Sequence, residues 1–482
     1  MFESIIAANR FGLGARPGEL AKIQTDPRAW LHDQVRGARA TPTAIQGLTD
    51  SAQIFQEQVA ALQQRRAAKQ AASSQTSQAS DAQTTNSKGL NKADLDRVRA
   101  VARHYQAQVM ARYQTAVRSE ESFRERLVHF WSNHFAVSSD KNAVRPLAAT
   151  LENEAIRPNL HLSFYDLLLA VESHPAMILY LDNQASVGPN SQLAELMKRR
   201  ANQQRKVDIN ENLGREILEL HTLGVNGGYT QTDVTRFATV LTGWSVGGDI
   251  TGGRLGKVIA QGTPGKFAFR TALHEPGAQT ILGKRYNQAG VEQPLAVLKD
   301  LAHHDATAQF IATKLARHFI ADTPPPQAVA QIAKAFRDSQ GDLPTVHTAL
   351  TNCDAAWQAT ANKYKTPHEF VVSTWRALDY VPNKPAQVVA AFEMLGQRPY
   401  TPGSPAGWAD IAGQWDGPDA LMKRIEWATQ LEVRGQNRSP LQLAEASLAD
   451  SLSEHTRMAI NGAEEATQGR VLWLMSPEFL RR

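Results

Sequence analysis

Apolar residues recur at three- and four-residue spacings along most of the 482-residue chain, and two-residue alternation is confined to one region. This pattern predicts a mainly α-helical, multi-helix globular body. Two long helices are expected over about 51–70 and 92–118. The segment between them, 71–91, is almost entirely Ala, Ser, Gln, Thr, Asp, Asn, Lys and Gly. We predict a low-complexity mobile loop there, because this composition buries too little apolar surface to offset chain entropy.

Capping signals mark the start of two helices further along the chain. Thr366 precedes Pro367, and Glu369 stands three residues after the threonine, which is the pattern of a capping box with proline in the first turn. Asp305 is expected to cap a helix over 306–320 in a similar way.

The pattern changes between about 243 and 286, where glycines cluster and strand-like alternation appears. Phe267 and Phe269 alternate with smaller or polar neighbours, and 279–283 is predicted to supply the facing strand. We therefore expect a small, glycine-rich β-hairpin insertion at 243–286 within a single helical domain that spans 1–482.

Composition limits the classes of partner and site. The net charge of +5 comes from 52 basic and 47 acidic residues, an excess too small to indicate nucleic acid as a partner. The single cysteine, Cys353, excludes an internal disulfide or a cysteine-rich metal site, and is predicted to be a small buried residue. No apolar run reaches the roughly 18 residues of a transmembrane segment. Residues 1–10 lack the features of a secretory signal, which predicts a cytoplasmic protein or, alternatively, a periplasmic or exported one that travels with a partner.

Several blocks distributed along the chain together resemble the bacterial domain-of-unknown-function family 1800 (DUF1800). The blocks are Asn9–Gly14, Phe130–Phe135, Pro175–Asp182, Asn210–Gly224, Leu241–Trp244 and Ser404–Trp408. The resemblance implies no established activity. It does imply proteins that are often exported and encoded beside a sulfatase- or phosphatase-like family, which points to the biology of the envelope or of extracellular polymers.

The 210–224 block is the most specific of these blocks and contains the first candidate site. As an α-helix at 100° per residue, it places four positions on a stripe that must face the core, namely Leu213, Ile217, Leu220 and Gly224. Glu216 lies at the edge of this stripe, and Asn212 and Glu219 share its side. Paired carboxylates at the margin of a core suit acid–base catalysis, so we predict Glu216 as acid or base and Asn212 as the residue that orients it.

A structural interpretation of the same helix stays open. Arg215 stands four residues from both Glu211 and Glu219, which is the spacing of a surface ion-pair ladder. His221 is predicted to project from the flank opposite Glu216, so the two side chains would need another element to share a ligand.

His134 is, with His221 as the alternative, the candidate that would complete the site. It lies near the centre of an apolar helix face formed by Phe123, Leu127, Phe130 and Trp131, and is therefore predicted to be buried. One interpretation is a core imidazole satisfied by a carbonyl or carboxylate. The other is a base or metal ligand that faces Glu216 or His221 across the core. The sequence leaves the question of a metal or another cofactor open.

Three further residues are candidates for binding substrate. On the 306–320 helix, Lys314 and Arg317 share one side, from which His318 is expected to point away. Two cations one turn apart either clamp a carboxylate or phosphate or form a solvated basic face. Trp408, in a loop rich in glycine and proline, either stacks on a sugar or another flat ligand or covers the helical core.

Three familiar catalytic or nucleotide-binding patterns fail in this chain. His274–Glu275 and His368–Glu369 lack the second histidine of a zinc-protease helix. The serine motif at 243–247 follows a predicted helix rather than the strand that a hydrolase elbow needs. The phosphate-loop pattern at 251–258 lacks its first glycine and its final hydroxyl.

These observations together predict an α-helical enzyme, a hydrolase or related activity on an envelope or extracellular polymer, that uses carboxylate and histidine acid–base chemistry. A polymer or sugar is the expected ligand. The alternative is a non-catalytic binding or escort protein whose helical surface docks the co-encoded sulfatase- or phosphatase-like partner that the resemblance implies.

Overall fold

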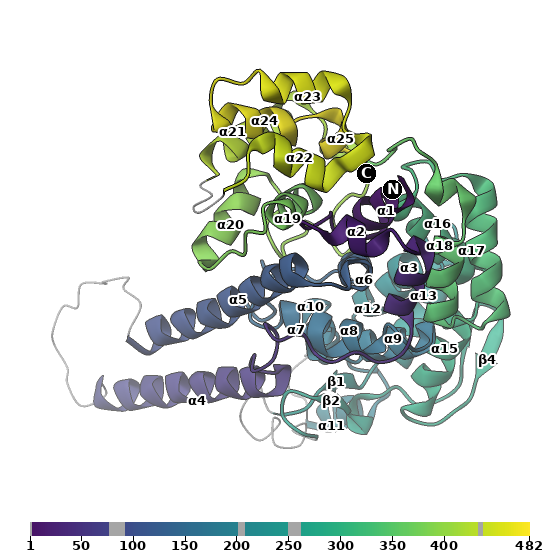
Figure 1. Cartoon of the computed structure of the whole chain (residues 1–482). Coiled ribbons are helices and arrows are strands. Elements are labelled where there is room, and N and C mark those ends of the chain that lie inside the picture. Colours follow the sequence, from purple (N-terminus) through teal and green to yellow (C-terminus); the bar gives the residue numbers. More distant parts are fainter. Residues whose placement is uncertain (1, 77–91, 201–207, 249–261, 432–436) are drawn as a thin grey trace.

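The computed structural model describes residues 2–76, 92–200, 208–248, 262–431 and 437–482. Helices dominate this part of the chain, and the only strands described form two small two-stranded sheets, so the fold is mainly α as predicted (Figure 1). None of the described helices combines the length and apolar character needed to cross a bilayer.

The chain begins with short helices that pack beside its last ones. They are α1 (Phe2–Ile6), the π-helical turn η1 (Ala7–Phe11), α2 (Glu19–Ile23) and α3 (Pro27–Val35). Figure 1 places both termini close together, at the junction of this group with the C-terminal helices. Asn9 Nδ2 donates to the carbonyl of Ser447 at 3.3 Å across this junction.

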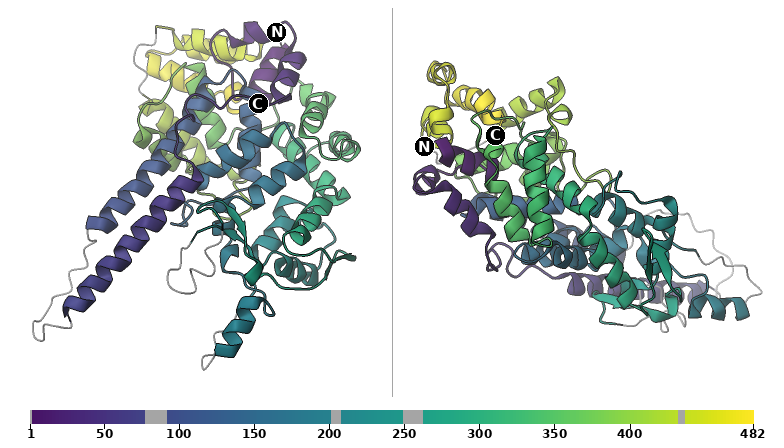
Figure 2. Two further views of the ribbon diagram at one scale, coloured as in Figure 1. Left: turned by 90° about the horizontal axis from the view of Figure 1, so that it is seen from below. Right: turned by 90° about the vertical axis from the view of Figure 1, so that its right-hand side faces the viewer.

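Two long helices, α4 (Ser51–Thr76) and α5 (Lys92–Arg118), run side by side and project from the body (Figure 1 and the left view of Figure 2). The predicted bounds of the second helix are confirmed. The first helix is longer than predicted, because Ala71, Ala72 and the residues after them continue it, and alanine is the strongest helix former. The rest of the predicted loop, 77–91, lies outside the described residues.

Helix α6 (Ser122–His134) runs through the centre of the body and is buried on nearly all its sides, including its charged residues. It packs against η1 and against a continuous helical segment made of α7 (Ala148–Thr150), η2 (Leu151–Ile156) and α8 (Arg157–Asn159). Buried charge on a central helix requires partners, and those partners shape the site described below.

The middle of the chain adds a further set of helices around α6. They are α9 (Phe164–Glu172), α10 (Pro175–Tyr180), η3 (Asn183–Ala185), α11 (Gln192–Arg200), α12 (Asn212–Glu216), η4 (Ile217–His221) and α13 (Gln231–Val240). The predicted 210–224 helix is therefore an α-helical turn followed by a π-helical one. In η4 the bonds span five residues, as when Leu223 N–H donates to the Leu218 carbonyl at 3.0 Å.

Four helices form the next layer, α15 (Glu292–Ala302), α16 (Asp305–Phe319), α17 (Pro326–Asp338) and α18 (Leu343–Thr351). The predicted helix at 306–320 is present, but the prediction that Asp305 caps it is wrong by one residue. His304 has the extended backbone of an N-cap, and its Nδ1 accepts the Ala306 N–H at 3.1 Å.

The C-terminal helices close the top of the molecule in Figure 1. They are η6 (Asp354–Trp357), α19 (Pro367–Ala377), α20 (Pro385–Met394), η7 (Ala412–Gln414), α21 (Pro418–Gln430), α22 (Pro440–Leu448), η8 (Ala449–Ser451), α23 (Glu454–Asn461), α24 (Ala466–Leu474) and α25 (Pro477–Leu480). The capping box predicted at Thr366 is confirmed, with both of its reciprocal bonds to Glu369.

The predicted strands are present, but their predicted pairing is wrong. Strand β2 (Phe267–Phe269) pairs antiparallel with β1 (Trp244–Val246), and the short helix η5 (Thr271–Leu273) follows. Strand β3 (Gln279–Ile281) pairs instead with β4 (Lys284–Tyr286) through the tight turn at Leu282 and Gly283. Alternation identifies a strand but not its partner. The sequence therefore did not show that β2 and β3 each pair with a different strand instead of with each other. The phosphate-loop pattern at 251–258 lies outside the described residues.

A buried arginine ties three parts of the fold together. Arg376 on α19 is fully buried and donates from Nη2 to both carboxylate oxygens of Glu19 at 2.9 Å. Its Nη1 donates to the carbonyls of Ala116, Val117 and Ser119, which lie at the end of α5 and lack helical partners. The N-terminal group, α5 and α19 are therefore held by one guanidinium group.

Arg376→Met should lower the free energy of unfolding by about 3–5 kcal/mol, because it leaves the Glu19 carboxylate buried without its charge partner and three helix-end carbonyls without the guanidinium donor. Chemical denaturation followed by circular dichroism measures this difference. Lys334→Met, which removes an exposed pair with Asp338, is the control and should change it by less than about 0.5 kcal/mol. Equal effects of the two substitutions would contradict the assigned role.

Candidate functional site

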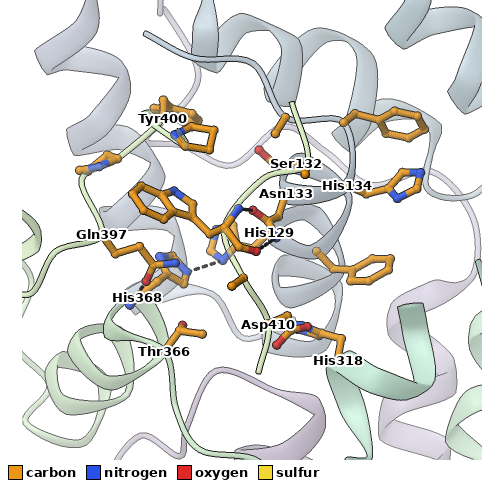
Figure 3. A pocket seen from close by; sticks show the side chains of 18 of the residues that line it. His129, Ser132, Asn133, His134, His318, Thr366, His368, Gln397, Tyr400 and Asp410 are labelled. Atoms are coloured by element: carbon orange, nitrogen blue, oxygen red, sulfur yellow. Dashed lines mark hydrogen bonds and ion pairs between the residues drawn. The ribbon is translucent and has the colours of Figure 1, made fainter. Parts of the chain in front are cut away.

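The body contains a cavity of about 410 Å³, within the roughly 300–1,000 Å³ typical of ligand sites. Its walls come from α5, α6, α16, the start of α19 and the loop 397–411. Figure 3 shows His368, Gln397 and Tyr400 on one side of it, and His134 and His318 on the other. The cavity therefore brings histidines from three helices together.

A pair of histidines forms one wall. His129 Nδ1 lies 2.9 Å from His368 Nε2, the contact drawn as a dashed line in Figure 3. His129 Nε2 lies 3.3 Å from Glu125 Oε1, and His368 Nδ1 lies 3.3 Å from the Tyr113 hydroxyl. With one proton on each ring, Nε2–H of His129 faces the carboxylate, Nε2–H of His368 donates to His129, and His368 Nδ1 accepts from Tyr113. The four groups form a relay from the cavity into the core, with hydrogen bonds at the Tyr113–His368 and His368–His129 steps and a charge contact rather than a hydrogen bond at Glu125.

Electrostatics fix the charge state of this relay. Burial alone would raise the pKa of Glu125, but the Arg157 guanidinium, which binds both carboxylate oxygens, lowers it overall below its ordinary value. Burial lowers the pKa of His368 well below 6.5, and the neighbouring His129 lowers it further. Burial also lowers the pKa of His129. At neutral pH the relay therefore consists of an ionised carboxylate and two neutral imidazoles.

An ion pair holds the two helices of the histidine pair together. Arg126, one turn before His129 on α6, pairs with Glu369, which follows His368 on α19. Arg482 Nη2 lies 2.6 Å from the same Glu369 oxygen. Glu369 is also the capping-box residue of α19, so its position is fixed from both sides.

The opposite wall carries a second imidazole–carboxylate contact. His318 Nδ1 lies 2.7 Å from Asp410 Oδ2, and its Nε2 accepts from Arg126 Nε at 3.2 Å. Burial lowers the pKa of His318 to about 4, so the ring is neutral and both of its nitrogens are occupied. The prediction that His318 points away from Lys314 is wrong, because residues four apart on a helix share a face and both line the cavity.

His134 is buried as predicted, at 1% exposure. Its Nε2 lies 3.1 Å from the carbonyl of His221, which fixes the proton on that nitrogen. Its Nδ1 has no hydrogen-bond partner within the described part of the chain. Burial lowers the pKa of His134 well below 6.5, with Lys314 adding to the effect, so Nδ1 carries a free lone pair.

The three residues predicted to bind substrate line the same cavity. Lys314 is half-buried and contacts the ring of Phe310, with Nζ 5.5 Å from the centroid. Arg317, one turn on, uses Nε to bond the Asp322 carbonyl at 3.3 Å. Whether these residues bind substrate stays a prediction, but their convergence with His134 on one cavity is established.

Trp408 is held in place by Asn133 of α6. The Asn133 side chain accepts from the Trp408 N–H at 2.7 Å and donates to the Trp408 carbonyl at 2.9 Å. Gly407 has a φ of +80°, and a Cβ there would lie 2.3 Å from the Asn133 carbonyl oxygen. This close approach requires glycine, and it fixes the backbone of Trp408 at the cavity wall.

The remaining predicted residues, Glu216, Asn212, Glu219 and His221, do not line this cavity. Asn212 is exposed and Glu219 is half-buried. Glu216 is half-buried too, and burial raises its pKa. Arg215 pairs with Glu211 at 2.9 Å, which is one of the two contacts that the ion-pair interpretation predicted.

His221 does not project from an opposite flank as predicted. It is fully buried, with Nδ1 2.7 Å from Glu172 Oε1. The helical wheel failed because η4 is π-helical, and each turn then contains more than 3.6 residues. The wider turn brings Leu218 and His221 into the core and leaves Leu220 only half-buried, at the cavity.

Sequence reasoning missed His129, His368, Tyr113 and the His318–Asp410 pair. A signal existed only for α6, where Arg126, His129 and Asn133 recur at three- and four-residue spacing. His368 was considered only as part of a failed zinc motif, because nothing in the sequence joins it to a residue 239 positions away. In the part of the chain that the structure describes, no three histidine, cysteine or carboxylate side chains are placed to hold a metal ion. Cys353 is buried as predicted.

Comparison with known proteins supports one relationship. No curated protein and no solved structure matches the chain. A family model described as "Protein of unknown function (DUF1800)" matches residues 6–481, which is nearly the whole length. The resemblance seen in the sequence blocks is thereby confirmed, and the chain belongs to the DUF1800 family.

Proposed function

We propose that this protein is a hydrolase that cleaves an envelope or extracellular polymer by acid–base chemistry in the cavity. The observation that carries the proposal is the Glu125–His129–His368 relay, an ionised carboxylate behind two neutral imidazoles that ends in a cavity of ligand size. Neutral imidazoles supported by a carboxylate are proton acceptors, and solvent-filled concave sites are where such groups meet substrate.

The proposed reaction uses the relay as base and then as acid. A water molecule attacks the carbon of the scissile bond, while its proton passes through the Tyr113 hydroxyl to Nδ1 of His368. The positive charge is shared with His129, beside the Glu125 carboxylate. The leaving oxygen then takes a proton back from the imidazolium as its bond to carbon breaks. One water is consumed for each bond cut, and the enzyme returns to its starting charge.

Two other groups support this reaction in the proposal. His134 lines the same cavity, and its neutral ring, held by the His221 carbonyl, forms part of the wall opposite the relay. Trp408, fixed by Asn133, offers a flat apolar surface on which a sugar ring stacks. Glu216 and Asn212 take no part in it, because they lie outside the cavity.

His368→Gln should reduce turnover at least about 100-fold, because the relay loses its proton acceptor at the cavity. The assay measures new reducing ends released from a panel of uronate-containing, sulfated and neutral polysaccharides. His303→Gln, at an exposed position on the surface, is the matched control and should retain full activity. Thermal denaturation of both variants verifies that the fold is intact.

Glu216→Gln decides between the two locations for the acid–base group. Normal turnover in this variant together with lost turnover in His368→Gln supports the cavity. The opposite result would overturn the relay and favour the 210–224 helix. Absence of turnover on every polymer in the wild-type protein would contradict the hydrolase proposal.

The acid limb of the pH–rate profile should lie below pH 6.5, the ordinary pKa of histidine. The direction of this displacement, toward acidic pH, follows from the lowered pKa values of His129 and His368. A lowered pKa keeps an imidazole neutral, and able to accept a proton, in more acidic solution. Titration of the two rings by NMR measures the same property without a substrate. A midpoint at or above 6.5 for both rings would contradict this assignment.

A further inference from the structure

The side chains that line the cavity carry an excess of positive charge. Five of them are cationic, Arg112, Arg126, Lys314, Arg317 and Arg398, and two are carboxylates, Glu369 and Asp410. Both carboxylates already have partners, since Glu369 pairs with Arg126 and Arg482, and Asp410 with His318 and Lys363. Among the described residues that line the cavity, no carboxylate therefore lacks a partner and could form an ion pair with the remaining cations.

The uncompensated charge is concentrated on α16. Arg112 and Arg126 pair with Glu152 and Glu369, and Arg398 lies 3.3 Å from Glu393. Among the described residues, Lys314 Nζ makes no hydrogen bond or ion pair, and its contact is the face of Phe310. Within the described ranges, Arg317 bonds a single carbonyl, through Nε, which leaves its terminal nitrogens available. These two cations lie one turn apart on the same helix face.

We propose that Lys314 and Arg317 together bind an anionic substituent of the substrate, so that the polymer is an acidic saccharide. This inference rests on the proposed function and adds the class of substrate to it. Two cations one turn apart can hold one anionic group, such as a carboxylate or a phosphate, between them by charge-assisted hydrogen bonds. Trp408 at the cavity wall provides the apolar face for the ring that carries the anion.

The surroundings of Lys314 give the inference a distinctive pH dependence. Asp410 from the loop 397–411, Arg317 from its own helix and His134 from α6 are the titratable or charged groups that face it. Burial lowers the pKa of Lys314 to about 8, with Asp410 opposing this effect and Arg317 adding to it. The amine is therefore charged at pH 7 and largely neutral at pH 9. Affinity for an anion should fall as the pH rises through 8.

Calorimetric titration with a matched pair of probes tests this. Oligogalacturonate and its methyl ester differ only in the charge of the carboxyl groups. At pH 7 the wild-type protein should bind the acid at least about tenfold more tightly than the ester, the size expected for one charge-assisted contact. At pH 9 most of this preference should be lost. Lys314→Arg, which stays charged, should keep the preference at both pH values, and Lys314→Met should lack it at both.

Additional titrations distinguish between the possible outcomes. Equal binding of acid and ester, or an unchanged preference in Lys314→Met, would overturn the anion site. Inorganic phosphate or sulfate that binds as tightly as the oligomer would overturn the saccharide part of the inference. The same titrations on His368→Gln keep this test independent of catalysis. A charge preference without turnover would reject only the hydrolase proposal, and turnover without a charge preference would reject only this inference.

Discussion

The ion pair between Arg126 and Glu369 is the interaction on which the site depends. It joins α6 to the first turn of α19, and each of its residues lies beside one member of the histidine pair. Charges buried this deeply are costly unless they are paired, so the two helices cannot separate or slide without leaving an unpaired charge in the core. The position of His368 against His129 is therefore set by electrostatics rather than by apolar packing, which would tolerate small shifts.

The helices were predictable wherever local signals decide structure. The capping box at Thr366 and the periodicity of 92–118 each identified an element correctly, because caps and apolar spacing act within a few residues. The partner of strand 267–269 was not predictable, since pairing with 244–246 depends on how a long intervening segment closes. The error at Asp305 also has a local cause. Aspartate is a preferred capping residue and histidine is not, but here the His304 side chain, one position earlier, accepts the capping hydrogen bond.

The site was predictable only in part, and the reason lies in two features that a sequence does not display. The first is the π-helical turn at 217–221, which changes the face that His221 presents and makes a regular wheel misleading. The second is contact over long separations, as between His129 and His368. The predicted residues that do line the cavity, His134, Lys314, Arg317 and Trp408, stood out because each contrasts with its own surroundings, as a histidine on an apolar face or an indole in a loop.

The two halves of the cavity are coupled through charge. The cations that surround the relay stabilise the neutral form of its imidazoles, and Arg112 is among the causes of the lowered pKa values of His129 and His368. An anion held by Lys314 and Arg317 adds a negative charge to the same cavity, which raises the affinity of His368 for a proton. Linkage makes this effect reciprocal, because a proton on the relay must then strengthen binding of the anion by the same factor. An acidic substrate would thus increase the strength of the base that acts on it, whereas a neutral polymer in the same cavity would leave the imidazoles weak proton acceptors.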